Sequence, residues 1–242
     1  MSNRIFAFDV DGTLTPSRSS IDAEFGKWFE KFAQTYPVYL VTGSDHPKTL
    51  EQLGKPIMSL VQRSYQCSGN DVWIRGETIR SNDWKLPYSA HAWLENVLEE
   101  SLFPLRTGTH IEQRPGMVNF SIVGRGADTA QRQRYAEYDQ AIDERRNIAD
   151  LFNLRFAELG IVANVAGDTG MDIQPRGADK SQIIPELKQL HPDAEIYFYG
   201  DKTAPGGNDH TIATALLSQG HSVFPVNNWQ DTFTLLKQTV EI

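Results

Sequence analysis

Near the start of the chain, a short apolar run ends abruptly in two carboxylates. Residues 5–8 form the run, which is typical of a buried strand, and Asp9 and Asp11 follow it. Residues two apart on an extended chain point to the same side, so both carboxylates can face one point beyond the strand. Gly12 then lets the backbone turn away. Carboxylates placed together repel each other unless a cation lies between them, and hard oxygen ligands favour Mg2+. The carboxylate held there can also attack phosphorus.

The two ends of the chain alternate apolar strand patterns with amphipathic helices. In residues 21–36, for example, Phe25, Trp28, Phe29 and Phe32 recur at helical spacing and predict one buried helix face. Further strands are predicted at 38–41, 194–199 and 221–224, helices at 46–53, 183–187, 209–218 and 229–238, and a hairpin at 73–79. A succession of this kind is typical of an α/β domain built on a parallel sheet.

The middle of the chain has a different character. Asp128 and Gln131 have the spacing of a capping box and open a long polar helical stretch that ends near Leu159. Strands are predicted at 108–112, 117–123, 161–165 and 171–173, and a further helix at 90–98. We therefore expect a catalytic core made of residues 1–80 and 179–242, interrupted by an inserted α+β cap at 81–178.

Composition excludes several classes of protein. The chain has 242 residues and a net charge of −8, which argues against a nucleic-acid partner because such binders usually carry a basic face. No apolar run approaches the length that a membrane span requires. Cys67 is the single cysteine, so an intrachain disulfide is impossible and a reducing cytoplasm fits.

Three predicted strands end in loops that carry chemically reactive side chains. Ligands of open α/β sheets gather at the carboxyl ends of the strands. One such end holds Asp9 and Asp11, a second is residues 42–45, and a third is the acidic loop 200–209. Asp201 would complete the oxygen shell of a cation with Asp9, and Asp209 would lie beside it or bind it directly.

Two further residue types suit a phosphate at the same place. Thr42 or Ser44 can donate a hydroxyl hydrogen bond to a phosphoryl oxygen, although strand-end hydroxyls often only cap the next helix. Lys180 stands at the start of a predicted helix, where backbone amides already favour anions. A lysine there can pair with the attacking carboxylate or with the phosphate that it carries.

These features resemble the haloacid dehalogenase (HAD) superfamily, and more closely the eukaryotic-type phosphomannomutases, over essentially the whole chain. The strings that carry the resemblance are FDVDGTLT (8–15), GSD (43–45), EQLG (51–54), YFYGDKT (197–203) and PGGNDH (205–210), with GTHIE (108–112), Arg114, GMVN (116–119) and GR (124–125) in the inserted segment. The resemblance implies a HAD-like Rossmannoid core with a cap of type C2b.

The resemblance also implies roles for individual residues. Asp9 would be the nucleophile and Asp11 the general acid and base, in an enzyme that uses Mg2+ and a hexose 1,6-bisphosphate primer. The implied metal ligands are Asp9, Asp11, Asp201 and Asp209, and the sugar phosphate would contact Arg18, Arg114, Arg125, Arg132 and Asp172 in addition to Thr42, Ser44 and Lys180. A homodimer formed through the cap and a place in GDP-mannose biosynthesis are further implications.

The arginines of the inserted segment support the same interpretation. Five of them lie close together in the sequence of an otherwise acidic protein, and guanidinium groups bind phosphate oxygens in bidentate fashion: Arg106, Arg114, Arg125, Arg132 and Arg134. A mutase needs such a pocket for the phosphate that is not reacting, whereas a sugar-phosphate phosphatase, the alternative enzyme, does not. A catalytically silent sugar-phosphate binder is disfavoured because every core catalytic position is filled.

The chain also departs from the family pattern. Gly170 stands where the family usually has a serine that contacts the substrate, so one hydroxyl contact is expected to be missing. Ala213 and Ala215 replace the ligands of a second cation. The resemblance implies a hexose-phosphate mutase that prefers mannose phosphates over glucose phosphates.

Overall fold

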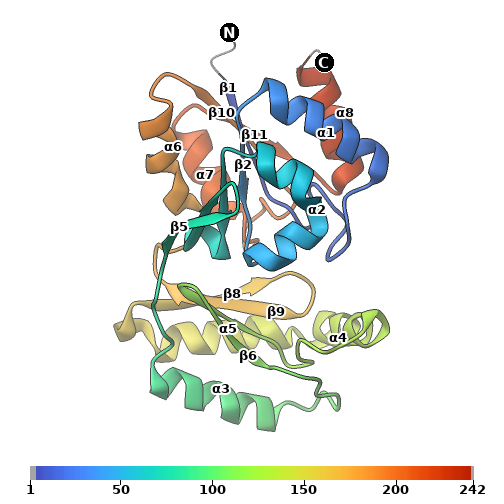
Figure 1. Cartoon of the computed structure of the whole chain (residues 1–242). Helices are drawn as coiled ribbons and strands as arrows, with labels where there is room; N and C mark the ends of the chain where they lie inside the picture. The colour runs from blue at the N-terminus through green and yellow to red at the C-terminus, as the bar shows by residue number, and fades with distance from the viewer. Residues whose placement is uncertain (1–3, 241–242) are drawn as a thin grey trace. The chain divides into compact units, whose positions relative to one another are not determined.

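The structure is a computed structural model that describes residues 4–240, and its chain divides into two compact units (Figure 1). Unit 1 contains the residues up to Ser81, Ala178–Pro205 and those from Asp209 onward. Unit 2 contains Asn82–Gly177 together with Gly206–Asn208. Each unit has its own sheet and its own hydrophobic core.

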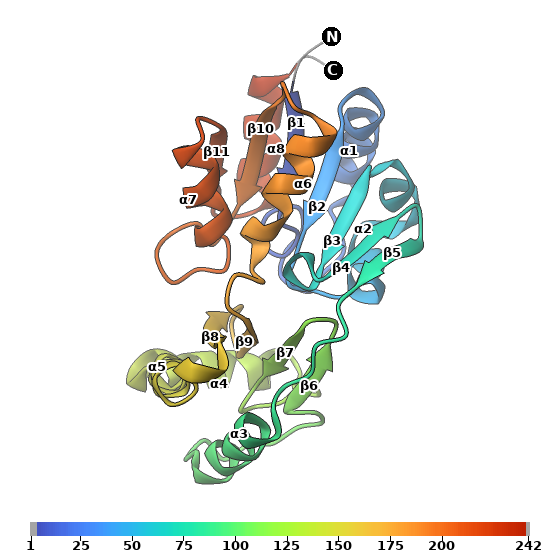
Figure 2. The same cartoon turned by 90° about the vertical axis from the view of Figure 1, so that its left-hand side faces the viewer.

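Unit 1 is built on a seven-stranded sheet whose middle strands run parallel (Figure 2). The strand order is β11-β10-β1-β2-β3-β4-β5, and β4 and β5 form an antiparallel hairpin at one edge. The bounds are β1 Arg4–Phe8, β2 Val38–Val41, β3 Arg63–Gln66, β4 Asp71–Ile74, β5 Glu77–Ser81, β10 Glu195–Gly200 and β11 Ser222–Pro225. Strand β1 therefore lies between β10 and β2, so its carboxyl end is surrounded by other strand ends.

Helices cover both faces of this sheet, which explains why β1 is apolar at consecutive positions. On one face, Phe6 and Phe8 pack in a cluster with α1 (Ala23–Thr35), α2 (His46–Leu60) and α8 (Trp229–Thr239). On the other face, Ile5 and Ala7 pack with α6 (Ile184–Leu190) and α7 (His210–Ser218). The aromatic residues of α1 belong to the first cluster, as their helical spacing predicted.

Unit 2 is a four-stranded antiparallel sheet with three helices packed against one face (Figure 1). The strand order is β6-β7-β9-β8. The bounds are β6 Ile111–Arg114, β7 Met117–Phe120, β8 Ile161–Ala166, β9 Gly170–Pro175, α3 Tyr88–Glu100, α4 Thr129–Ile142 and α5 Glu144–Arg155. The capping box that Asp128 and Gln131 predicted is present at the start of α4.

The two faces of the unit 2 sheet differ in chemistry because side chains alternate along a strand. Val118, Phe120 and Ile173 lie on the face that packs against the helices. The alternate positions form the opposite face, which we call the polar face. Its side chains include Glu112, Arg114, Asn119, Asp172 and Gln174.

The predicted fold class is confirmed: a parallel-sheet α/β core and a separate antiparallel sheet with helices. Strand β3 was not predicted, because only Tyr65 in Arg63–Gln66 is apolar. In the helical stretch that follows Asp128, Ile142 is 48% exposed and Leu151 is 58% exposed, so these two apolar residues lie outside the core. Between residues 4 and 240, no helix combines the length and the apolar character needed to cross a bilayer.

Candidate active site

Three carboxylates meet at the carboxyl edge of the unit 1 sheet. Asp9 follows β1 and Asp201 follows β10, and the pairing of Phe8 with Tyr199 brings these two strand ends level. Asp209 immediately precedes α7. Their ligand oxygens all lie within 4.8 Å of one another. Asp9 is 3% exposed and Asp209 is fully buried, so the parallel sheet gathers negative charge in a place that water hardly reaches.

Two glycines make room for these carboxylates. A Cβ atom at Gly12 would lie 2.5 Å from Oδ2 of Asp201, and Gly12 also has a φ of +84°. A Cβ atom at Gly200 would lie 2.8 Å from Oδ2 of Asp209. Larger residues at these positions would push the carboxylates apart, so both glycines are part of the site.

Lys180 bridges two of the three carboxylates. It begins the 3-10 helix η3 (Lys180–Ile183), and its Nζ donates to Oδ1 of Asp9 at 2.7 Å and to Oδ1 of Asp209 at 2.6 Å. Burial alone would lower the pKa of Lys180, but Asp209 and Asp9 outweigh it and hold that pKa above its usual value. The lysine is therefore a permanent cation beside Asp9.

The charge of this cluster fits a divalent cation. One ammonium group faces three carboxylates. Burial raises the pKa of Asp9 well above its usual value, and Asp209 and Asp201 raise it further against the effect of Lys180. Burial and Asp209 likewise raise the pKa of Asp201, while Lys202 opposes them. Such shifts mean that the cluster lacks positive charge, and Mg2+ is a cation that carboxylate oxygens bind well.

Asp11 does not belong to this cluster, although its spacing from Asp9 predicted a shared metal site. Its Oδ2 accepts hydrogen bonds from Lys48 Nζ at 2.6 Å and from Ser44 Oγ at 3.0 Å. Its Oδ1 accepts from the backbone N–H of Arg18 at 2.8 Å and from Gln52 Nε2 at 3.0 Å. Strand β1 ends at Phe8, so the alternation that predicted a shared face does not extend to Asp11, and the two aspartates have different partners.

This second network gives Asp11 a different acidity from Asp9. Burial would raise the pKa of Asp11, but Lys48 outweighs it through its charge and its hydrogen bond and lowers the pKa to about 2. Asp11 is thus ionised at neutral pH and can accept a proton. Asp9 and Asp11 are two carboxyl groups whose environments move their pKa values in opposite directions, which is typical of sites with separate acid–base roles.

Lys48 and Gln52 were not predicted from the sequence. Each of these residues lies four positions after the previous one in the series Ser44, Lys48 and Gln52. The helical spacing of the last two places them on one side of α2. That spacing was the available signal, but a lysine and a glutamine on a helix are ordinarily solvent-exposed. Only the packing of α2 beside β1 shows that they point at Asp11.

The strand-end hydroxyls have two different functions. Thr42 Oγ1 accepts a hydrogen bond from the Ser44 N–H at 3.1 Å, so Thr42 shapes the turn after β2. Ser44 Oγ instead contacts Asp11, and Lys48 Nζ donates to it at 3.0 Å. Of the two hydroxyls, Ser44 therefore lies in the network around Asp11.

The basic residues of unit 2 are only partly gathered. Arg114 and Arg125 both bind the carboxylate of Glu112, with Arg114 Nε at 2.8 Å and Arg125 Nε at 3.3 Å. Arg132 lies on α4. Arg106 is used differently, because its guanidinium donates to the backbone carbonyl oxygens of Leu98, Ser101, Phe103 and Leu105 and so supports a loop.

Asp172 and Arg18 complete the set of predicted binding residues. Asp172 lies on the polar face, where Asn119 Nδ2 donates to its Oδ1 at 2.8 Å. Arg18 contributes its backbone N–H to Asp11, and its φ of +57° places it in the left-handed region. A non-glycine residue in that region is strained, which is common where a loop must present a functional group.

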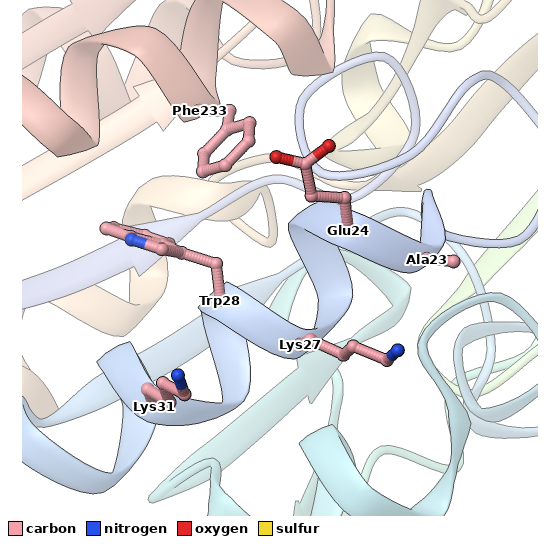
Figure 3. A pocket seen from close by; sticks show the side chains of 6 residues that line it. All are labelled: Ala23, Glu24, Lys27, Trp28, Lys31 and Phe233. Atoms are coloured by element: carbon pink, nitrogen blue, oxygen red, sulfur yellow. The ribbon is translucent and has the colours of Figure 1, made fainter.

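A surface pocket elsewhere in unit 1 is not part of this site. It has a volume of about 370 Å³ and lies along α1 and α8 (Figure 3). Its lining residues are Ala23, Glu24, Lys27, Trp28, Lys31 and Phe233. None of them belongs to the carboxylate cluster or to the network around Asp11, so this pocket is separate from the candidate active site.

Comparisons with known proteins agree with this geometry. The sequence model of the family described as eukaryotic phosphomannomutase matches residues 25–242, a match that begins after Asp9 and Asp11. The phosphomannomutase of Saccharomyces cerevisiae is 34% identical over an alignment of 224 positions, which covers 89% of this chain and 87% of that protein. The phosphomannomutase of Schizosaccharomyces pombe is 31% identical over an alignment of 250 positions, which covers 97% of this chain and 93% of that protein.

Solved structures show the same fold at lower identity. A haloacid dehalogenase-like hydrolase from Bacteroides thetaiotaomicron has a TM-score of 0.60 at 12% identity and covers 98% of this chain and 99% of that chain. This similarity establishes a HAD-like fold, and the sequence matches identify the branch within it. The chain belongs to the eukaryotic phosphomannomutase family.

Proposed function

We propose that this protein is a phosphomannomutase that interconverts mannose 1-phosphate and mannose 6-phosphate through an aspartyl-phosphate on Asp9. The observation that carries the proposal is the pairing of buried Asp9 with Lys180 inside a three-carboxylate cluster. A nucleophilic carboxylate needs a fixed position and neighbouring positive charge as phosphate approaches it. Membership of the family supports the same assignment.

The proposed reaction begins with Asp9 phosphorylated. A sugar hydroxyl attacks the phosphorus, the bond between Asp9 and phosphorus breaks, and Asp11 takes the hydroxyl proton. Ionised Asp11 suits this step, because its pKa is held at about 2. The hexose 1,6-bisphosphate then turns around, and Asp9 attacks its other phosphate. Asp11 returns the proton to the departing sugar oxygen, which restores the phosphorylated enzyme.

Other residues of unit 1 prepare this chemistry. Asp9, Asp201 and Asp209 would hold Mg2+, which supplies positive charge to the phosphoryl oxygens when it is bound. Lys180 keeps the Asp9 carboxylate oriented through a 2.7 Å hydrogen bond. Ser44 and Lys48 hold Asp11 and present donors beside it.

Unit 2 is proposed to be the cap that selects the substrate. Arg114 and Arg125, together with Arg132 and Arg18, would bind the phosphate that is not reacting, and Asp172 would bind sugar hydroxyls. Glu112 already holds the first two arginines side by side, and their two positive charges exceed its single negative charge. A phosphatase that uses the same Asp9 chemistry has no need of this second site, so the arginines favour the mutase. Glucose phosphates, which differ at one hydroxyl, are proposed as further substrates.

Phosphorus NMR separates the two enzyme classes. Mannose 1-phosphate incubated with the protein, Mg2+ and a trace of hexose 1,6-bisphosphate is expected to convert to mannose 6-phosphate. Accumulation of inorganic phosphate instead would replace the mutase with the phosphatase. Asp9→Asn is expected to abolish turnover, and full activity in that variant would show that Asp9 is not the nucleophile.

A homodimer through unit 2 is also proposed. Six of the strongly exposed large apolar side chains belong to unit 2: Tyr88, Leu102, Ile142, Leu151, Leu154 and Leu159. An interface between two copies of unit 2 would cover some of these side chains. Light scattering of the purified protein measures its mass directly. A cytoplasmic location and the supply of mannose 1-phosphate for GDP-mannose complete the proposal.

A further inference from the structure

Two carboxamide oxygens on the polar face of unit 2 are buried without a hydrogen-bond partner. They are Oδ1 of Asn119 and Oε1 of Gln174, and no partner for either lies within residues 4–240. Asn119 is 6% exposed and Gln174 is 4% exposed. Buried polar atoms nearly always have partners, because leaving one unsatisfied costs free energy. Two such atoms on one sheet face require an explanation.

The orientation of the Asn119 amide is determined by its neighbours. Its Nδ2 donates to Asp172 Oδ1 at 2.8 Å and lies 3.4 Å from the carbonyl oxygen of Met171. Both neighbours are acceptors, so the amide nitrogen must face them and Oδ1 must point away. The unsatisfied oxygen is therefore a consequence of the strand pairing that places Asn119 opposite Asp172.

Gly170 leaves the space that the Asn119 amide occupies. A Cβ atom at position 170 would lie only 2.9 Å from Asn119 Nδ2. A serine at this position would therefore displace the amide. Position 170 thus lacks the serine hydroxyl of the family pattern. The carboxamide of Asn119 is the polar group at this place on the sheet.

Gln174 lies on the same face two residues beyond Asp172, in regular pairing with Val162 of β8. An apolar side chain would fill this buried position at lower cost, as Met171 and Ile173 do on the other face of the same strand. A carboxamide here provides an acceptor beside a carboxylate. Asn119 Oδ1 and Gln174 Oε1 are therefore two acceptors in need of donors, on the same sheet face as Asp172.

We propose that Asn119 Oδ1 and Gln174 Oε1 accept hydrogen bonds from ring hydroxyl groups of the hexose phosphate and so determine sugar specificity. A sugar ring offers several hydroxyl donors on a rigid frame, which suits two acceptors on one sheet face. Arg114 lies on the same face and bears a charge suited to the phosphate. This inference rests on the proposed function, because it assigns the sugar contacts of that same substrate.

Gln174→Met is the most informative variant, because methionine has nearly the same shape and lacks the carboxamide. No hydrogen bond of Gln174 within the described chain is lost, so the thermal midpoint of the variant is expected to be equal or higher. Calorimetric titration with mannose 6-phosphate is expected to show about five- to tenfold weaker binding. A purely structural glutamine would change stability and leave this affinity unaltered.

Analogues that each lack one ring hydroxyl identify the contact. The unaltered protein is expected to bind one analogue about five- to tenfold more weakly than mannose 6-phosphate. Gln174→Met should bind that same analogue with the affinity that the unaltered protein has for it. Asn119→Leu should show the same coupling with a different hydroxyl. Asn164→Leu is the matched control, because Asn164 of β8 pairs with Asp172 across the sheet and its side chain is exposed.

The outcomes distinguish this inference from the proposed function. Equal losses of affinity for every analogue in Gln174→Met, or unchanged binding of mannose 6-phosphate, would overturn the assignment of the acceptors. Failure of the unaltered protein to bind any hexose phosphate would overturn the proposed function and this inference together.

Discussion

Asp9 and Asp11 are close in sequence but differ in their electrostatic surroundings. Burial and two neighbouring carboxylates raise the pKa of Asp9, whereas Lys48 lowers the pKa of Asp11 to about 2. The surroundings of Asp9 thus favour its protonated form against the effect of Lys180, whereas Asp11 is ionised throughout the neutral range. The carboxyl group proposed to attack and the one proposed to move protons thus differ through their neighbours, because both are aspartates.

Replacing Lys48 tests this separation. In Lys48→Met the pKa of Asp11 is expected to rise, because the cation that lowers it is gone. The acidic limb of the pH profile of kcat/KM should then move to higher pH, and kcat should fall by up to about a hundredfold. Steady-state rates between pH 4 and 9 measure both effects. Lys55→Met, an exposed lysine of the same helix, is the control, and an acidic limb that stays in place would contradict the role of Lys48.

At the scale of elements, one carboxylate ties a helix to two strands. Glu186 of α6 forms an ion pair with Arg80 of β5 at 2.9 Å and another with Arg63 of β3. The hydroxyl of Tyr65 donates to the same carboxylate at 3.1 Å. Burial would raise the pKa of Glu186, but the hydrogen bond and charge of Arg80 and the other partners lower it below 4.5. These contacts join elements that are distant in sequence.

The stability effect of Glu186 depends on pH in a defined direction. A lowered pKa in the folded state means that the unfolded chain binds more protons, so this contribution is present above pH 4.5 and disappears on acidification. Glu186→Gln is expected to lose about 1–2 kcal/mol of unfolding free energy at pH 7. Urea denaturation should show a smaller difference in unfolding free energy between Glu186→Gln and the unaltered protein near pH 4 than at pH 7. Glu77→Gln, at an exposed position of β5, should show no such difference. A difference in unfolding free energy of equal size at both pH values would exclude the ion pair as the cause of that difference.

At the scale of the whole molecule, folding concentrates negative charge that the sequence spreads over its length. The chain carries a net charge of −8, and three of its carboxylates come from positions 9, 201 and 209. Lys180 neutralises only part of their charge. The folded protein should therefore bind a divalent cation, and the unfolded chain should not, because unfolding disperses the ligands.

Mg2+ is expected to raise the thermal midpoint by a few degrees, since a ligand at about a hundred times its Kd adds about 2.7 kcal/mol to stability. Differential scanning fluorimetry with Mg2+, and again after chelation, measures the shift, with sodium chloride at equal ionic strength as control. Asp201→Asn should remove most of the shift because it removes one ligand. The same shift in both proteins would place the cation elsewhere.

The sequence by itself determined the elements and the class of chemistry. Apolar runs and helical periodicity depend on local spacing, so the strands around Asp9 and Asp201 and the helix that begins after Asp128 could be predicted. The motif strings likewise indicated the family. Strand β3 escaped prediction because its polar residues satisfy no local rule and are held by pairing with β2 and β4.

The tertiary structure alone decided which side chains surround Asp11. Lys180 and Asp209 were expected near Asp9 from the sequence, whereas Lys48 and Gln52 were found at Asp11 only in the fold. The partners of a carboxylate depend on which strand ends and helices are neighbours in the sheet. Sequence spacing does not determine that strand order. For the same reason, the unsatisfied oxygens of Asn119 and Gln174 became apparent only once the strands of unit 2 were paired.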